Sequence, residues 1–338
     1  MNRRIVISFW ILAALLILAV YLNLFYGVVT LPSSEVWAAI IGSNCNETTQ
    51  FIVCNSRVPQ IVTAILSGAS LAVSGLLLQT SFANPLADPG ILGVNAGASL
   101  GVAIVMLLMG GSLSVGNMSL GGCAAILFAA FVGAALVLGM LVFFASVLSN
   151  NLMLLIVGLM VSYITSAVIS LLNTFSTADG VHSYIFWGMG NFEGVSSSQL
   201  PIFGALLVVG LLASLALIKP MNALLLGERY AENLGFSIRW TRVILLLVTG
   251  VLTAVATAFC GPIAFLGLAV PHMARLMSGT ANHRFLLPLT MLAGAVVASL
   301  SEWMCHVPSG NVLIPLNVIT SLWGVPVILY VLFFKRVA

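Results

Sequence analysis

The residues of this chain that could carry chemistry are few and widely spaced. Its four histidines form no H-x-x-H or H-x₃-H pair, and its five cysteines form no C-x-x-C pair. Zinc sites and redox-active thiols ordinarily need such spacings, so we expect no metal site and no redox chemistry. The sequence also lacks a G-x-x-x-x-G-K-[ST] loop. Any ATP hydrolysis linked to this chain must therefore come from a partner protein.

Two carboxylates stand near the ends of apolar runs, where a charge facing lipid would be costly. Asp88 precedes Pro89 and Gly90 and is predicted to cap a helix, with proton coupling as the alternative. Glu302 either reaches toward the headgroups or faces a vestibule, and the sequence leaves both open. A transporter driven by an ion gradient needs several carboxylates inside its spans, and a membrane-embedded enzyme needs a catalytic constellation there. Neither pattern is visible, and the ion-gradient transporter is kept as the alternative function.

The elements that hold these residues are predicted to be membrane-spanning helices. Of 338 residues, 61% are hydrophobic and 6% are charged, and the mean hydropathy is +1.19. Soluble proteins carry about a quarter charged residues, so most of this surface must face lipid. The net charge of +3 is too small to suggest nucleic-acid binding. We predict an all-α, polytopic integral membrane protein that forms a single transmembrane domain over residues 1–338.

Apolar runs predict about ten transmembrane helices. The predicted ranges are 5–27, 57–79, 91–109, 119–146, 152–173, 199–218, 241–259, 263–277, 285–304 and 314–334. Placing the N-terminus in the cytoplasm puts ten of the eleven basic residues inside and leaves only Arg57 outside. Because this bias follows the positive-inside rule, both termini are predicted to be cytoplasmic.

Residues 219–240 form the only long basic loop on the predicted cytoplasmic side. Two short helical pieces, apolar on one side and charged on the other, are predicted to flank Gly227. A loop of this length with structure of its own is often functional. The alternative is an interfacial helix that rests on the membrane.

The third predicted span carries glycines four residues apart, at Gly93, Gly97 and Gly101. Helices in lipid associate by close packing, and small residues permit that approach. These glycines therefore predict tight helix packing rather than a pore.

Several blocks of residues occur in one order along the chain. They are Arg57-Val58-Pro59-Gln60, Asn84-Pro85-Leu86-Ala87-Asp88-Pro89-Gly90, Leu226-Gly227-Glu228, Gly261-Pro262-Ile263-Ala264-Phe265, Pro271-His272-Met273-Ala274-Arg275 and Ile314-Pro315-Leu316-Asn317. These blocks resemble the FecCD family, the permeases of type II ABC importers for ferric siderophores, haem and vitamin B12. The resemblance runs from about residue 57 to the C-terminus, and it does not separate these substrates.

The resemblance implies a bacterial inner-membrane homodimer with a translocation path along its two-fold axis. Two cytoplasmic ATPase subunits would hold ATP and Mg²⁺, and a periplasmic binding protein would deliver the substrate. Within 219–240, the residues that match the family's ATPase-coupling helices are Met221, Asn222, Leu226, Gly227, Glu228, Leu234 and Gly235. The turns that match its cytoplasmic gate contain Asn84, Pro85, Asn150 and Asn151.

The outer rim departs from the family pattern. Relatives dock glutamates of the binding protein with arginines, and Arg57 is the matching residue here. Gln60 stands where a second arginine is usual, and His306 stands near a position that is commonly basic. The resemblance thus implies that Arg57, Gln60 and His306 form the docking site. Docking of the binding protein is then either weaker than in relatives or made through different contacts.

Cys45 and Cys54 enclose a polar stretch on the predicted outer side, in a compartment that permits disulfides. A bridge would hold the loop that precedes Arg57. Two unpaired thiols are the alternative, since spacing alone does not set the distance between the two Cα atoms.

Overall fold

The computed structural model describes residues 3–27, 29, 31–42, 45–108, 120–148, 151–306 and 314–334. Within these ranges the secondary structure consists of α-helices and two π-helical stretches, η1 and η2, with no strand. The all-α class expected from composition is therefore confirmed.

Each predicted apolar run corresponds to a helix. In chain order these helices are α1 (Arg3–Phe25), α4 (Val58–Ser81), α5 (Val94–Ala103) continued by η2 (Ile104–Leu108), α6 (Leu120–Val147), α7 (Asn151–Phe175), α9 (Leu200–Ala216), α12 (Ile238–Cys260), α13 (Leu266–Ser278), α14 (His283–His306) and α15 (Leu316–Phe334). The remaining helices are α2 (Ser33–Ile41), α3 (Glu47–Phe51), η1 (Ile52–Arg57), α8 (Ala178–Gly188), α10 (Ile218–Leu225) and α11 (Glu228–Asn233).

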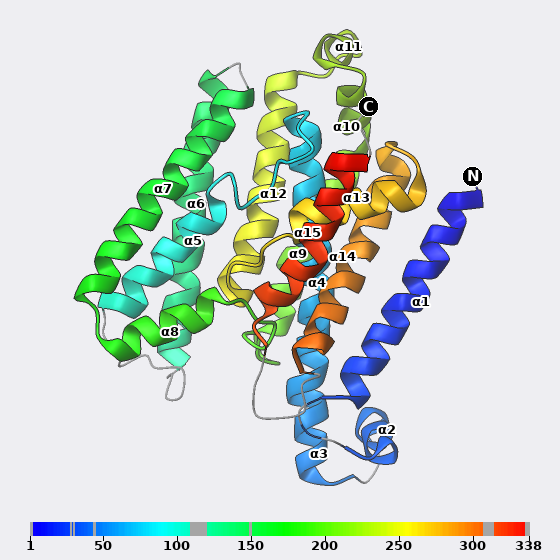
Figure 1. The fold of residues 1–338 in the computed structure, drawn as a ribbon, viewed down its shortest axis with the longest axis vertical. Coiled ribbons are helices and arrows are strands. Elements are labelled where there is room, and N and C mark those ends of the chain that lie inside the picture. The colour runs from blue at the N-terminus through cyan, green and yellow to red at the C-terminus, as the bar shows by residue number, and fades with distance from the viewer. Residues whose placement is uncertain are drawn as a thin grey trace. The chain divides into compact units, whose positions relative to one another are not determined.

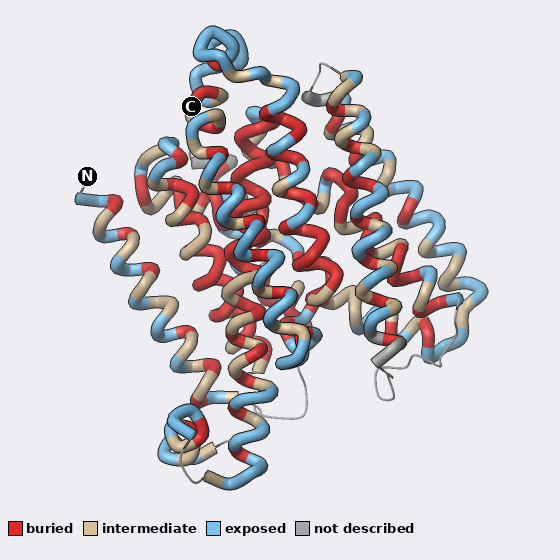
Figure 2. The backbone as a smooth tube through the Cα atoms, turned by 180° about the vertical axis from the view of Figure 1, so that it is seen from behind, coloured by how far each residue is buried: buried red, intermediate tan, exposed pale blue. Residues whose placement is uncertain are grey.

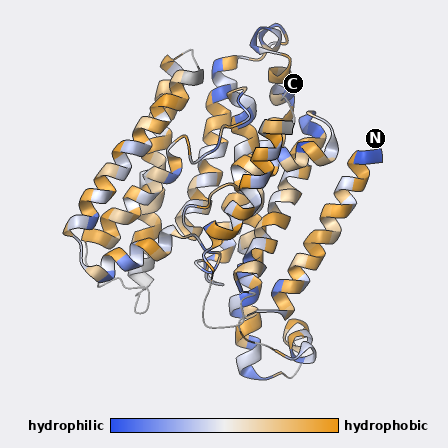
Figure 3. Ribbon diagram, viewed as in Figure 1, coloured by the Kyte–Doolittle hydropathy of each residue, from blue (hydrophilic) through white to orange (hydrophobic). Residues whose placement is uncertain are grey.

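The helices differ in whether they can cross a bilayer unaided. Among the described residues, six helices are long and apolar enough, or seven if α9 and α10, bent by 49°, count as one span. The apolar helices at 94–108 and 316–331 are shorter. Helix α13 has 13 residues, which reach about 20 Å of the roughly 30 Å hydrocarbon core. Figure 3 shows apolar residues along most of these helices.

The chain divides into two compact units. Unit 1 comprises Met1–Ala72, Asn191–Val209 and Ala264–Ala338, and unit 2 comprises Val73–Gly190 and Gly210–Ile263. In unit 1, α14 packs against α1, α13 and α15 (Figure 1). Buried positions of α1 form one stripe that includes Ile5, Leu12 and Ala19, and Figure 2 shows the rest of this helix partly or fully exposed. The exposed apolar side of α1 is suited to lipid.

In unit 2, α6 packs against α5, α7 and α12. A Cβ added at Gly97 or Gly101 would collide with the backbone of α6 at Gly133 or Ala129. These two glycines therefore allow the two backbones to touch. Gly93 differs from the expectation, because it precedes α5 and takes φ +81°. It lies against Gly158 of α7.

Candidate functional site

The segment 219–240 folds into a short helical hairpin. Helices α10 and α11, labelled in Figure 1, are separated in the sequence by Leu226 and Gly227. Gly227 has φ +104° and ψ 153°, a backbone region open essentially to glycine alone. The predicted break at Gly227 is thus explained by its backbone conformation. A second left-handed glycine, Gly235 at φ +87°, follows α11.

One side of this hairpin is anchored and the other is exposed. Met221, Ala223 and Ala231 are buried, so they form the anchored side. The exposed side carries large apolar side chains, and we define the hairpin surface as Leu225, Leu226, Tyr230 and Leu234. Leu226 is 64% exposed and Leu234 is 55% exposed.

The hairpin surface is unlike the lipid-facing sides of the long helices. Glu228, Arg229 and Glu232 are exposed on α11 among its apolar residues, and Figure 3 shows this helix as mostly polar. Burial of such charges in hydrocarbon is costly. A mixed apolar and charged surface of this kind is typical of a protein interface.

A salt bridge joins α11 to α12. The Arg242 guanidinium donates to the Glu228 carboxylate at 3.1 Å, with the Arg242 side chain 8% exposed and the Glu228 side chain 52% exposed. This pair orients the first turn of α11, and a partly exposed bridge contributes less than about 1 kcal/mol to stability.

The loop between α4 and α5 contains part of the predicted gate. Asn84 Oδ1 accepts a hydrogen bond from the Leu86 backbone N–H at 2.9 Å, which forms a local turn. Pro85 lies in the same turn. Asn151 is the first residue of α7, and Asn150 lies outside the described residues. The gate assignment stays a prediction.

Asp88 has a different role from the predicted helix cap. Its Oδ1 accepts from the Gly90 backbone N–H at 2.8 Å, whereas α5 begins at Val94 with Gly93 at the N-cap position. Asp88 therefore stabilises a turn that precedes the helix. Burial raises the pKa of its carboxyl group to about 6, and the hydrogen bond from Gly90 opposes this rise.

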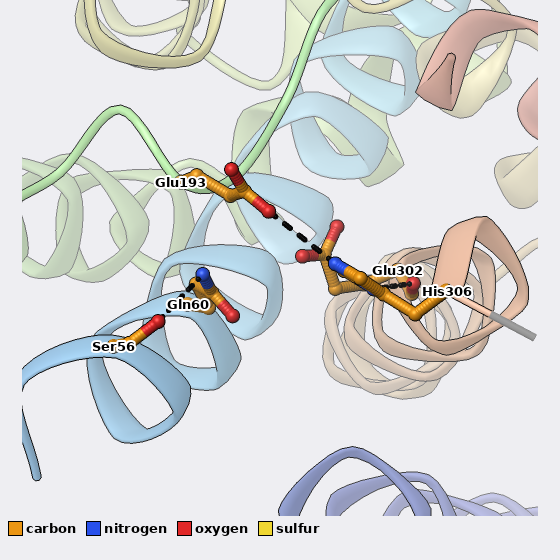
Figure 4. A network of polar contacts seen from close by, with 5 residues as sticks. All are labelled: Ser56, Gln60, Glu193, Glu302 and His306. Atoms are coloured by element: carbon orange, nitrogen blue, oxygen red, sulfur yellow. Dashed lines mark hydrogen bonds and ion pairs between the residues drawn. The ribbon is translucent and has the colours of Figure 1, made fainter. Parts of the chain in front are cut away.

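The three residues assigned to docking line one pocket of unit 1. The pocket has a volume of about 220 Å³, and its polar lining comes from Asn23, Ser56, Arg57, Gln60, Glu193 and His306. Gln60 Nε2 donates to Ser56 Oγ at 3.1 Å (Figure 4). The structure thus brings together residues that are far apart in the sequence.

Arg57 departs from the expectation of an exposed charge. It is buried, and its guanidinium donates to the backbone carbonyls of Leu24 and Val29. These carbonyls lie at or beyond the end of α1, so Arg57 satisfies acceptors that the helix leaves unpaired. Its structural role is therefore clear, and a docking role stays a prediction.

Two acidic residues that sequence reasoning did not assign lie beside His306. Glu193 Oε1 is 3.3 Å from His306 Nε2, and Glu302 lies one helical turn before His306 on α14. Glu193 and His306 are 113 positions apart. No local spacing could signal this pair. The one partial signal in the sequence was Glu302, a carboxylate near the end of an apolar run, which was expected to face either the headgroups or a vestibule.

Of the two alternatives for Cys45 and Cys54, the structure has the unpaired thiols. The Cys54 sulfur instead lies 3.8 Å from the Ala39 carbonyl oxygen of α2. The segment between the two cysteines folds into α3 and the start of η1, so the thiols belong to separately positioned turns.

Known proteins are similar to this chain in sequence and in fold. The FecCD transport family matches residues 15–334. The vitamin B12 import system permease protein BtuC of Citrobacter koseri is 34% identical over 96% of this chain and 93% of its own length. The same protein of Serratia proteamaculans is 37% identical over 85% of this chain and 83% of its own length.

Two solved structures agree with this result. One, an inward-facing metal-chelate type ABC transporter, has a TM-score of 0.83 and 31% identity, and the match covers 97% of this chain and 99% of that one. PsaBC from Streptococcus pneumoniae in complex with Fab has a TM-score of 0.55 at 14% identity, with 89% of this chain and 96% of that chain covered. The second likeness concerns the fold alone.

The long apolar helices define a class, the multi-pass integral membrane protein. Within that class, the chain belongs to the FecCD transport family. It is the permease of an ABC importer of the inner membrane and is not itself an ATPase. The alternative of an ion-gradient transporter is thereby set aside.

Proposed function

We propose that this permease carries a large metal chelate, namely cobalamin, a ferric siderophore or haem, from a periplasmic binding protein into the cytoplasm. The vitamin B12 permeases that it resembles over most of its length and the metal-chelate transporter with the same fold support this substrate class. The sequence of the permease does not choose among the three chelates.

The proposed assembly is a homodimer of this chain with two cytoplasmic ATPase subunits and one binding protein. Both termini and the α10–α11 hairpin face the cytoplasm in this proposal. The bias of basic residues toward that side supports this orientation. In this assembly, ATP and Mg²⁺ bind to the ATPase subunits.

The observation that carries the proposal is the hairpin surface. Four large apolar side chains are exposed on a hairpin that is anchored by Met221 and oriented by the Glu228–Arg242 bridge. An apolar surface of this kind is stabilised when a partner covers it. We propose that the hairpin fits a cleft of the ATPase subunit, and that Asn222 and Gly235 belong to this contact.

Two further assignments complete the proposal. Arg57, Gln60 and His306 mark the rim where the binding protein docks, with the pocket of unit 1 at that rim. The turns at Asn84-Pro85 and Asn150-Asn151 close the cytoplasmic side of the path. Crosslinks between cysteines placed at position 84 of the two protomers should depend on the nucleotide state, and crosslinking that ignores nucleotide contradicts the gate.

Transport by the reconstituted complex tests the function. Proteoliposomes with the permease, its ATPase and its binding protein should take up cyanocobalamin, a ferric siderophore or haemin only when ATP is supplied on the ATPase side. A Gly227→Trp permease should insert normally but lose ATP-driven uptake. Uptake of none of the three chelates contradicts the substrate class, and normal uptake by Gly227→Trp contradicts the coupling role.

A further inference from the structure

Three side chains of unit 1 converge at the C-terminal end of α14. Glu302 and His306 come from this helix, and Glu193 comes from the segment between α8 and α9 (Figure 4). One carboxylate oxygen from each glutamate and one ring nitrogen of the histidine all lie within 4.8 Å of one another. These are ligand types that divalent metal ions take in proteins.

Glu302 is the unusual member of this cluster. The residue is only 4% exposed, and its Oε1 is buried without a hydrogen-bond donor among the described residues. A buried carboxylate oxygen without a partner is costly, and native structures rarely leave one. An occupant that is positively charged would satisfy this oxygen.

The orientation of His306 points to the same occupant. Its Nδ1 lies 2.8 Å from the Glu302 backbone carbonyl oxygen. Because a carbonyl only accepts, Nδ1 carries a proton and donates it. The other nitrogen, Nε2, then faces the carboxylates. Histidines that bind metals commonly donate their second ring nitrogen to a carbonyl in this way, which fixes the tautomer.

Two occupants could sit at Nε2, a proton or a metal ion. A proton would make an imidazolium that pairs with Glu193 across 3.3 Å, but it would leave Glu302 Oε1 unpaired. A metal ion would engage all three residues at once. Ligands about 2.1 Å from a tetrahedral metal lie about 3.4 Å apart, close to the separation between His306 Nε2 and Glu193 Oε1.

We infer that Glu193, Glu302 and His306 form a binding site for a divalent transition-metal ion such as Zn²⁺. Two carboxylates outweigh Arg57, the one arginine or lysine among the described residues that line the pocket, and its guanidinium is turned to the carbonyls of Leu24 and Val29. The three ligand atoms lie within 4.8 Å of one another. Glu193 is exposed, so its side chain can move to bring its carboxylate closer to the other two ligands. The pocket lined by Glu193 and His306 leaves room for water as a further ligand.

A metal at this site would join two separate segments of unit 1. It would link the α8–α9 connection, through Glu193, to the last turn of α14. The inference is independent of the transported chelate, because it concerns the chain's own side chains. It also differs from docking, since it needs no binding protein.

Zn²⁺ titration of the tag-free, full-length permease in nanodiscs tests the inference. After treatment with a chelator, the wild-type chain should bind one Zn²⁺ per chain by calorimetry and unfold at a higher temperature with Zn²⁺ than without it. Glu302→Gln and His306→Gln should each weaken binding by tenfold or more, since loss of even an outer-shell partner has effects of 10- to 100-fold. Mn²⁺ and Mg²⁺ titrations define the class of ion.

Two further variants keep the test decisive. Glu193→Gln changes an exposed residue, so it should fold even if Glu302→Gln does not, and it should also weaken binding at least tenfold. His182→Gln removes an exposed histidine on α8 and should leave binding unchanged. Absence of Zn²⁺ binding to the wild type, or equal binding by Glu193→Gln and the wild type, overturns the inference.

Discussion

The α10–α11 hairpin of unit 2 and the pocket of unit 1 that Arg57 and His306 line use opposite chemistry. The hairpin exposes apolar side chains, whereas the pocket is lined by the buried Arg57 and lies beside the buried Glu302. In the hairpin, the charged side chains are exposed to solvent or paired in the Glu228–Arg242 salt bridge. The apolar side chains of the hairpin surface are exposed as well. Beside the pocket, a buried carboxylate oxygen of Glu302 has no hydrogen-bond partner among the described residues.

The difference indicates what each region meets. An apolar surface is stabilised by another protein surface, and the gain grows with the area covered. A buried charge is stabilised only by a specific opposite charge or by hydrogen bonds. The hairpin is therefore suited to a macromolecular partner, and the pocket is suited to an ion or to a few directed polar contacts.

Arg57→Ala should produce the largest effect, and it should act on stability. The substitution leaves the carbonyls of Leu24 and Val29 without their donor, and we expect the free energy of unfolding to fall by about 3 kcal/mol. Chemical unfolding in detergent measures this change in the free energy of unfolding. The control, Arg239→Ala, removes an exposed arginine at the start of α12 and should change stability by less than about 0.5 kcal/mol. Equal effects of the two variants contradict the structural role of Arg57.

The same Arg57→Ala protein also separates the structural role from the docking role. If a carboxylate of the binding protein pairs with Arg57, the variant should dock more weakly and with less dependence on salt. Affinity is measured at low and high ionic strength on the fraction that remains folded. Unchanged affinity and unchanged salt dependence remove the docking role and leave only the structural one.

Gly227→Ala should lower stability by about 2 kcal/mol, because φ +104° with ψ 153° is strained for any residue with a Cβ. Space is not the cause, since nothing lies within 4 Å of an added Cβ at this position. The matched control is Gly139→Ala in α6, which also has open space but lies inside a helix. It should be neutral or stabilising. Identical thermal shifts in the two variants would show that the hairpin does not depend on this backbone conformation.

Leu226→Ala should leave stability unchanged and weaken the complex with the ATPase. Leu226 is 64% exposed, so little packing is lost in the isolated permease. We expect a loss of about 1–2 kcal/mol in affinity for the partner, within the range of interface leucines. Leu212→Ala in α9 changes a leucine of similar exposure, 59%, outside the hairpin surface. If both variants bind the ATPase equally well, the hairpin surface is not the contact.

Asp88 provides the smallest effect and tests a buried carboxyl group in unit 2. Its pKa is raised from 3.8 to about 6 in the folded state, so the folded protein binds more protons than the unfolded chain between these values. Stability should therefore fall as the pH rises from about 4 to about 6, by about 1 kcal/mol given the partial solvent access of the side chain.

Asp88→Asn is the matched variant for this pH dependence. It keeps an oxygen that can accept from Gly90 but cannot ionise, so its unfolding free energy should lack this dependence. The difference between the two proteins, measured at pH 4, 5, 6 and 7, isolates Asp88. A difference that does not change with pH contradicts the shifted pKa.

The sequence by itself determined the helices and the family. Runs of about 20 apolar residues must form helices in lipid, because every backbone group needs an internal hydrogen bond there. For this reason each predicted run corresponds to a helix. The break at Gly227 was also readable, since a glycine between two short amphipathic pieces marks a special backbone conformation.

Only the tertiary structure decided the side-chain contacts. From its place before a span, Arg57 is expected to be an exposed charge. In the structure, the packing of α1 brings backbone carbonyls to its guanidinium. Histidine spacing reports only ligands on one helix or turn, so it cannot indicate a site assembled from separate segments, such as the one we infer. Glu193 reaches His306 across 113 positions through the packing of two separate segments, and no local pattern encodes such a meeting.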